Sequence, residues 1–262
     1  MPETENKQLK NFHFILQGKG GVGKTTVASF IAQYLKDRLQ KDYLAIDTDQ
    51  VNASFASFKA LNVESLNIME NNQILPRGWD TLLEKIINSD KSNIIIDNGA
   101  SSFVPLIAYA IENDMIDLLT SEENSYTGNV FIHVVIAGGE GLAHTLAGLN
   151  MICEKFNQDN VMIIAWLNEY LGSIEQAGRQ FKDMDEYKKN KSRIFTVIKI
   201  PTYTSDTFGK DISDMLSKNR IFSEMIVSPS VNIASRNRYN KVQKEIFALL
   251  DNISDIFDEE EE

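Results

Sequence analysis

Cysteine and basic residues are scarce in this chain of 262 residues. The single cysteine, Cys153, excludes a disulfide framework within the chain and is typical of a protein from a reducing compartment. It also excludes an iron–sulfur cluster held by one chain, because such clusters need several thiolates. Only 26 lysines and arginines stand against 37 aspartates and glutamates, so the bulk charge argues against general binding to nucleic acid.

Long apolar runs are also missing. No stretch approaches the roughly 18 consecutive apolar residues of a membrane-spanning helix, and residues 1–10 lack the apolar core of a signal peptide. We therefore expect a cytoplasmic protein. Its organisation is predicted as a flexible N-terminus over residues 1–10, a single domain over residues 11–252 and an acidic C-terminal tail over residues 253–262.

The string GKGGVGKTT at residues 18–26 is the strongest signal in the sequence. It fits G-x-x-x-x-G-K-[ST], the pattern of a phosphate-binding loop, and lies between an apolar stretch (11–17) and a segment of helical apolar spacing (27–39). Lys24 is expected to neutralise the β- and γ-phosphates of ATP, and the Thr25 hydroxyl to ligate Mg²⁺. The expected nucleotide contacts in this loop are Gly18, Lys19, Gly20, Gly21, Val22, Gly23, Lys24, Thr25 and Thr26.

Two further apolar stretches end in acids. Residues 43–47 end at Asp47, with Asp49 just beyond, and residues 93–97 end at Asp97. In a sheet whose first strand carries a phosphate-binding loop, these carboxylates are expected to face the nucleotide. Asp97 occupies the position of a Walker B acid, which holds Mg²⁺ through water.

Strand and helix patterns alternate along the rest of the chain. Further strands are predicted over 66–69, 130–137, 161–167 and 194–200, and helices over 79–87, 142–156, 173–187 and 239–257. Such alternation predicts an α/β fold: a three-layer, doubly wound, mainly parallel sheet with helices on both faces.

The loop string resembles the deviant Walker A signature of the ParA/MinD family of dimerising ATPases. The resemblance implies that Lys19 reaches across a two-fold axis to the phosphates bound by the other subunit, although a solvated loop lysine is the alternative. It also implies that Asp49 positions or deprotonates the attacking water and that Asp47 supports the Mg²⁺ shell. For Asp47, a turn cap is the alternative. The catalytic set implied is Lys19, Lys24 and Asp49, with Thr25, Asp47 and Asp97 at the metal.

The same resemblance implies a site for the base. Asn168 ends a predicted strand, at the position where an Asn amide contacts adenine in the wider family, and its amide has both donor and acceptor groups. A turn asparagine is the alternative. Pro201 and Tyr203 follow the next strand, in the family's base-contacting loop.

Four longer stretches resemble one branch of the family, the TraL and StbB-like proteins of conjugative plasmids. They are IDTDQVNASF (46–55), KALNVESLNIME (59–70), IIDNGASSFVPL (95–106) and FKDMDEYKKNKSRIFTVIKIP (181–201). The resemblance implies a role in conjugal transfer or plasmid maintenance, with another plasmid-encoded or conjugation protein as partner.

The prediction is therefore a slow, Mg²⁺-dependent ATPase that forms a homodimer in its ATP state. One alternative is a plasmid partition ATPase with nonspecific DNA binding, for which the basic residues at 188–193 and 236–244 are candidates. Others are a P-loop small-molecule kinase or synthetase and a nucleotide-binding scaffold without useful hydrolysis. No stable membrane binding is expected, because the C-terminal amphipathic segment runs into acids.

Overall fold

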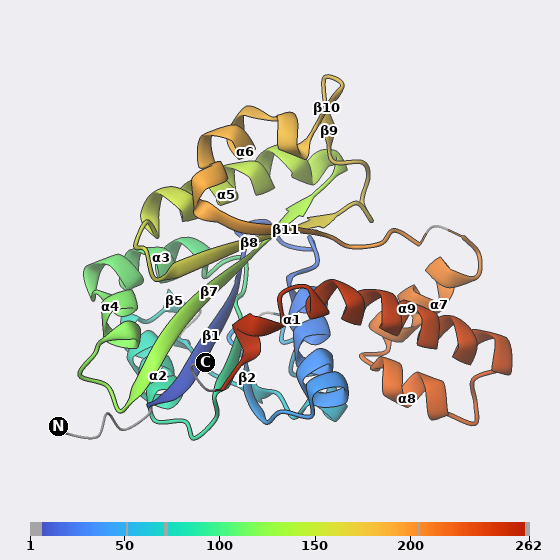
Figure 1. Ribbon diagram of the computed structural model, residues 1–262, viewed down its shortest axis with the longest axis horizontal. Coiled ribbons are helices and arrows are strands. Elements are labelled where there is room, and N and C mark those ends of the chain that lie inside the picture. The colour runs from blue at the N-terminus through green and yellow to red at the C-terminus, as the bar shows by residue number, and fades with distance from the viewer. Residues whose placement is uncertain (1–6, 51, 71–72, 204, 260–262) are drawn as a thin grey trace.

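The central sheet has seven strands in the order β11–β8–β7–β1–β6–β2–β3 (Figure 1). Their bounds are β1 Gln8–Leu16, β2 Tyr43–Asp47, β3 Glu64–Ser65, β6 Asn93–Asp97, β7 Tyr126–Ala137, β8 Val161–Asn168 and β11 Ile194–Lys199. All neighbouring pairs in this sheet are parallel. The structure is a computed structural model that describes residues 7–50, 52–70, 73–203 and 205–259.

Helices cover both faces of the sheet. They are α1 Lys24–Gln33, α2 Pro76–Ile87, α3 Phe103–Glu112, α4 Met115–Thr120, α5 Leu142–Lys155, α6 Asp185–Asn190, α7 Phe208–Ser217, α8 Phe222–Val227 and α9 Ile233–Asp251. The core is split by the sheet: α2 to α5 pack on one face, and α1, α8 and α9 on the other. The predicted three-layer, doubly wound fold is confirmed.

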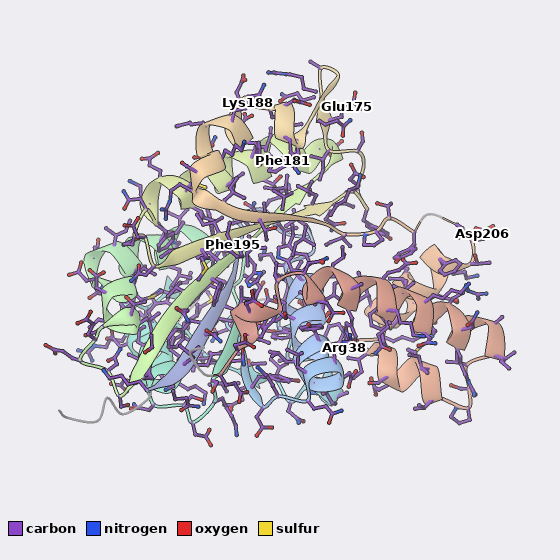
Figure 2. All side chains as sticks on the ribbon, in the orientation of Figure 1. Arg38, Glu175, Phe181, Lys188, Phe195 and Asp206 are labelled. Carbon is purple, nitrogen blue, oxygen red and sulfur yellow. The ribbon has the colours of Figure 1, made fainter. Side chains whose placement is uncertain are left out.

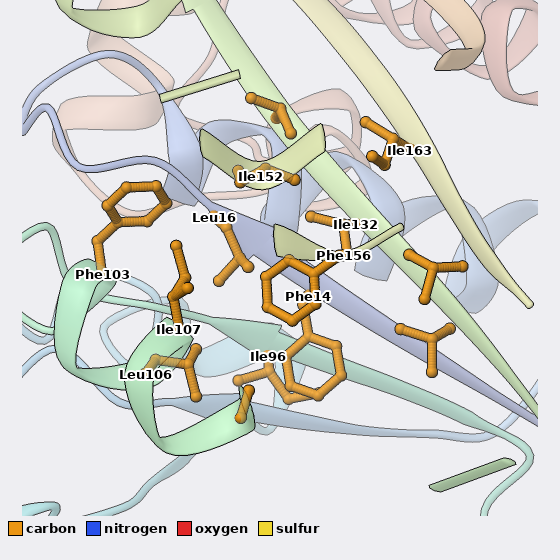
Figure 3. Packing of buried hydrophobic residues seen from close by; sticks show 14 of the residues in the cluster. Phe14, Leu16, Ile96, Phe103, Leu106, Ile107, Ile132, Ile152, Phe156 and Ile163 are labelled. Atoms are coloured by element: carbon orange, nitrogen blue, oxygen red, sulfur yellow. The ribbon is translucent and has the colours of Figure 1, made fainter. Parts of the chain in front are cut away.

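Successive side chains along a strand point to opposite faces of the sheet, which explains the two cores. In β1, Phe12 and Phe14 face the helices α2 to α5, whereas Ile15 faces α1. Figure 3 shows Phe14 packed with residues of α3, α5 and the neighbouring strands. Because both faces are covered, the strands read as continuous apolar runs such as Ile94–Ile96, all of which are buried.

Two predicted elements are wrong. Residues 173–187 do not form one helix: the strands β9 (Glu175–Gln176) and β10 (Arg179–Gln180) form a hairpin there, followed by a helical turn and α6. Gly178 and Ala177 have φ values of +75° and +51°, a left-handed conformation that a helix interior does not allow. Glu175 lies on the projecting hairpin, and Phe181 points back into the core (Figure 2).

The strand predicted over 66–69 is also replaced. β3 ends at Ser65, and a separate hairpin pairs β4 (Met69–Glu70) with β5 (Gln73–Ile74). The Asn67 side chain accepts a hydrogen bond from the backbone N–H of Met69 over 2.8 Å. This Asx-type turn interrupts the strand between the two pieces.

The predicted domain boundaries need correction at both ends. β1 begins at Gln8, so residues 8–10 belong to the sheet rather than to a flexible N-terminus. At the other end, a 3₁₀ turn at Ser254–Phe257 buries Ile256 and Phe257. The side chain of Asn11 donates to the Asp258 carbonyl over 2.6 Å. Residues 1–6 and 260–262 lie outside the described part.

The C-terminal amphipathic segment is therefore a packed helix, α9, joined to a packed turn. Its apolar side, which includes Tyr239, Val242 and Ile246, is buried against the body of the domain. In the part of the chain that the structure describes, no helix combines the length and apolar character needed to cross a bilayer.

Two buried histidines lie side by side in the sheet. The Trp166 indole N–H donates to His133 Nδ1 over 3.0 Å, and His133 Nε2 lies 3.1 Å from His13 Nδ1. Because the indole can only donate, a neutral His133 carries its proton on Nε2 and donates it to His13. Burial lowers the pKa of His13 to about 3 and the pKa of His133 well below its ordinary value.

Candidate nucleotide-binding site

The glycine string forms a loop between β1, the centre of the sheet, and α1 (Figure 1). Gly21 and Gly23 have φ values of +74° and +102°, which side chains strongly disfavour. A Cβ atom on Gly23 would also lie 2.6 Å from Asn168 Nδ2. The loop thus delivers its backbone N–H groups and the N-terminus of α1 to one point, as anion binding requires.

At the first glycine of the loop, Gly18, a larger residue is excluded by the neighbouring side chain and not by the φ angle. A Cβ atom on Gly18 would lie 2.8 Å from Cδ1 of Phe103, the first residue of α3. Phe103 is buried in the core shown in Figure 3. The loop is therefore packed directly against the helix that follows Asp97.

Lys24 and Lys19 differ sharply in their surroundings. Lys24 is buried, and its Nζ donates to the Lys19 carbonyl over 3.4 Å. Burial lowers the pKa of Lys24, whereas the charges of Asp97 and Asp49 act to raise it. The Lys19 side chain is exposed at the mouth of the loop. One lysine is directed into the site, and the other is presented at its rim.

Asp97 and Thr25 form the centre of the site. The Thr25 hydroxyl donates to Asp97 Oδ2 over 2.6 Å and lies 2.9 Å from the Ser54 hydroxyl. Asp97 Oδ1 is buried and has no hydrogen-bond partner among the described residues. Burial raises the pKa of Asp97 to about 7, with the Thr25 hydrogen bond opposing the rise and Asp47 adding to it.

These groups fit a magnesium ion. Mg²⁺ keeps several waters and is held in such sites by one or two protein oxygens plus phosphates, rather than by a cage of side chains. The orphaned Asp97 Oδ1 and the Thr25 hydroxyl supply such oxygens. Among the described residues, no cluster of three or more His, Cys, Asp or Glu side chains offers a complete cage.

Asp47 holds the loop that follows β2. Its Oδ1 accepts from the backbone N–H of Asp49 and its Oδ2 from that of Ala56, both over 2.9 Å. Burial raises the pKa of Asp47, and these two hydrogen bonds oppose the rise. Both oxygens accept from backbone donors, as the turn-cap interpretation expects, and each keeps a second lone pair that a water of the Mg²⁺ shell could use.

A cleft of about 670 Å³ lies beside the phosphate-binding loop, and Asp49 lines it. Its Oδ1 accepts from the Asn52 N–H over 3.0 Å, and a Cβ atom on Gly99 would lie 2.9 Å from its Cγ. Gln50 instead points its side-chain amide at Asn67, away from the cleft. The carboxylate is therefore placed between the two loops that flank the site.

Sequence reasoning missed several polar residues of this cleft. Asn52, Ser54, Asn98 and Ser101 line it together with the loop, Asp49 and Asp97. Ser54, next to the Thr25 hydroxyl, is the most informative of them. Its only sequence signal was its place in the stretch that follows Asp49.

A second cleft of about 400 Å³ adjoins the first at Gly21, Gly23 and Thr26. Its walls include all three residues predicted to contact the base, namely Asn168, Pro201 and Tyr203, together with apolar side chains of α1, α7 and α9. An apolar slot beside a phosphate loop suits a nucleobase.

The amide of Asn168 is largely engaged within the protein. Its Nδ2 donates to the Val22 carbonyl over 2.9 Å, and its Oδ1 accepts from the Tyr170 N–H over 3.1 Å. These contacts tie the end of β8 to the phosphate-binding loop. They favour the turn interpretation of Asn168, with one N–H left for a ligand.

Two sets of buried groups predict opposing effects of pH on stability. His13 and His133 are both neutral in the fold. Each pH unit of acidification below pH 6.5 therefore lowers the free energy of unfolding by about 1.4 kcal/mol for each histidine. Asp97 acts in the opposite sense, because its native pKa of about 7 lies above its ordinary value of 3.8. Its proton uptake stabilises the fold as pH falls.

We therefore expect Asp97→Asn protein to lose about 3 kcal/mol of unfolding free energy between pH 7.5 and pH 5.5, and the parent to lose less. Urea denaturation at the two pH values measures this. His144, which is exposed, provides the control, since His144→Ala should leave both pH dependences unchanged. Equal stability of Asp97→Asn protein at both pH values would contradict the assignment of two neutral, buried histidines.

Comparisons with known proteins identify the family of this chain. A model of the CobQ/CobB/MinD/ParA nucleotide binding domain matches residues 13–238. Two curated Escherichia coli proteins, each called Protein TraL, are 42% and 40% identical over 243 and 244 residues, which cover 93% of this chain and 98% of each relative. The resemblances predicted from the sequence are confirmed.

A solved structure shares the fold. A ParA family ATPase from Chlorobium tepidum TLS superposes with a TM-score of 0.50 at 18% identity, over 89% of this chain and 98% of that one. With its phosphate-binding loop, its acids at the strand ends and these matches, the chain belongs to the CobQ/CobB/MinD/ParA family of nucleotide-binding proteins, in the group that includes the TraL proteins.

Proposed function

We propose that this protein is a Mg²⁺-dependent ATPase whose bound nucleotide sets its dimerisation, and that it acts in plasmid conjugal transfer or maintenance. The observation that carries the proposal is the buried Asp97 Oδ1, which has no partner among the described residues and lies beside the Thr25 hydroxyl. An ionised, unpartnered carboxylate oxygen is costly inside a protein. A bound Mg²⁺ would offset that cost, with Asp97 and Thr25 as the residues that would hold it.

The catalytic roles that we propose are supported by the positions of three side chains. Lys24 lies buried in the loop, where it neutralises the β- and γ-phosphates. Thr25 and Asp97 would hold Mg²⁺, which when bound would supply positive charge to offset that of the phosphates. Asp49, at the edge of the cleft, orients the attacking water. Hydrolysis is expected to be slow, as suits a switch rather than a metabolic enzyme.

Dimerisation rests on the exposed lysine. Lys19 projects from the mouth of the loop while Lys24 occupies its interior, so Lys19 has no evident task in its own site. In a two-fold dimer it would reach the phosphates of the other subunit, and the exchange would occur twice. The exposed position of Lys19 supports the proposed homodimer in the ATP state.

The cellular role rests on the TraL relatives, which share 42% and 40% of their residues with this chain. Another plasmid-encoded or conjugation protein is the expected partner. On α9, two of the four candidate cations for nonspecific DNA binding are engaged within the protein, whereas Lys241 and Lys244 are exposed. Arg238 is paired with Asp211 over 2.6 Å, and Arg236 Nε donates to the Val231 carbonyl over 2.8 Å.

Phosphate release from ATP tests the enzymatic part. The parent protein should release phosphate slowly and only with Mg²⁺, and Thr25→Ala should lose most of the stimulation by Mg²⁺. Ser29→Ala is the matched control, because that buried hydroxyl of the same helix donates only to the Thr26 carbonyl. A Thr25→Ala protein with the parent's response to Mg²⁺ would exclude Thr25 as a contact of the ion.

A further inference from the structure

Gln17 is the last residue before the phosphate-binding loop, and its side chain is completely buried. Its Nε2 donates to the carbonyl of Val135 on β7 over 2.9 Å and to that of Thr145 on α5 over 3.1 Å. Its Oε1 accepts from the backbone N–H of Gly18 over 2.9 Å. One side chain thus connects the start of the loop to a neighbouring strand and to a helix.

The three contacts determine how the amide is oriented. Two carbonyl oxygens require the NH₂ group, and a backbone N–H requires the oxygen, so the reverse orientation would lose all three hydrogen bonds. Both amide protons are used. The side chain therefore holds the N–H of Gly18 in one direction at the point where the chain leaves β1.

Gly148, in the middle of α5, makes room for this amide. A Cβ atom there would lie 2.2 Å from Gln17 Oε1 and 3.0 Å from its Cδ. Glycine inside a helix is destabilising relative to alanine. At this position its missing side chain lets Gln17 reach the carbonyl of Thr145, one turn earlier in the helix.

We propose that Gln17, seated in the notch at Gly148, is the positioning residue for the phosphate-binding loop. It does not touch the nucleotide. It sets the direction in which Gly18 leaves the strand, and so the place at which the N–H groups of the loop meet the phosphates of a nucleoside di- or triphosphate. The inference rests on the proposed function, because it presumes that the loop binds such a nucleotide.

Four variants separate positioning from packing. Gln17→Ala removes the amide, Gly148→Ala pushes it out of its notch, and the double variant lets the new methyl group occupy the vacated space. Gln17→Met keeps the volume of the side chain but has none of the three hydrogen bonds. Leu149→Ala is the control, since Leu149 is a buried α5 residue in the apolar core that includes Phe14 and Ile132.

Mg-ATP and Mg-ADP are titrated into each protein by calorimetry, well below its melting temperature. We expect the four Gln17 and Gly148 variants to bind both nucleotides about tenfold more weakly, because a loss of this size corresponds to about one or two hydrogen bonds. The double variant should melt closer to the parent than either single alanine variant does. Leu149→Ala should melt lower yet bind like the parent.

The outcomes distinguish the two proposals. Parent affinity in the double variant and in Gln17→Met would show that Gln17 only fills space, and would overturn the positioning role while the nucleotide site stands. A tenfold loss in Leu149→Ala would overturn it as well, because affinity would then follow stability alone. A parent protein that binds neither nucleotide overturns the proposed function and this inference with it.

Discussion

Replacing Lys24 by alanine should weaken ATP binding by at least about 100-fold, because hydrogen bonds to charged groups contribute about 1.5–3 kcal/mol each and Lys24 serves two phosphates. Two carboxylates near Lys24 should increase this loss of ATP affinity. Asp97 and Asp49 both act on Lys24 through their charges, so without the lysine the site would present uncompensated carboxylates to an anionic ligand. Isothermal titration with Mg-ATP measures the loss.

Lys19→Ala is the matched control for this experiment. Lys19 belongs to the same loop, five residues earlier, but its side chain is exposed and its contact with Lys24 is made by its backbone carbonyl. A single subunit carrying Lys19→Ala should therefore bind ATP within a few-fold of the parent. ATP affinity that is unchanged in Lys24→Ala would refute the assignment of this loop as the phosphate site.

Asp49→Ala should keep ATP bound while slowing its hydrolysis by about 100-fold or more, the usual size of an acid–base contribution. Asp49 lines the phosphate cleft, but its Oδ1 accepts a hydrogen bond from the Asn52 N–H rather than from an N–H of the loop glycines. Its removal takes away the group that orients water and leaves the groups that hold phosphate.

Asp42→Ala is the control for this second prediction. Asp42 lies just before β2, at the opposite end of that strand from Asp49, and its exposed carboxylate pairs with Lys91 over 3.2 Å. That variant should hydrolyse ATP at the parent rate, as followed by phosphate release with saturating ATP. Parent-like turnover by Asp49→Ala would mean that another group activates the water.

The fold and the phosphate loop could be predicted because their signals are local. The glycine string, its two lysines and its flanking strand and helix lie within about 30 consecutive residues, and buried parallel strands such as β6 read as apolar runs that end in an acid. Such patterns do not depend on which distant segment packs against them.

What could not be predicted depends on contacts between distant segments. Gln17 is an ordinary polar residue in the sequence, and its role appears only when Thr145 and Gly148 of α5 are brought beside it. The same holds for Asn168, whose amide is engaged by Val22 from the loop.

The prediction of an acidic tail over residues 253–262 was wrong because it followed the charge of the segment and not its few apolar residues. The predicted acidic tail after residue 252 contains Ile253, Ile256 and Phe257, all of which are buried. Charge dominates the composition there, but three apolar side chains are enough to hold the segment against β1 and β6. The carbonyl of Phe257 also accepts from the Asn93 side chain over 3.2 Å.

We propose that ATP, and not ADP, joins two subunits through Lys19. Light scattering on Asp49→Ala protein, which retains its ATP, measures this most directly. With Mg-ATP we expect twice the chain's mass of 29.6 kDa, and with Mg-ADP the mass of one chain. Adding Lys19→Ala should restore the monomer while ATP stays bound. A double variant that remains dimeric in ATP, or a parent mass that does not depend on the nucleotide, would contradict dimerisation through Lys19.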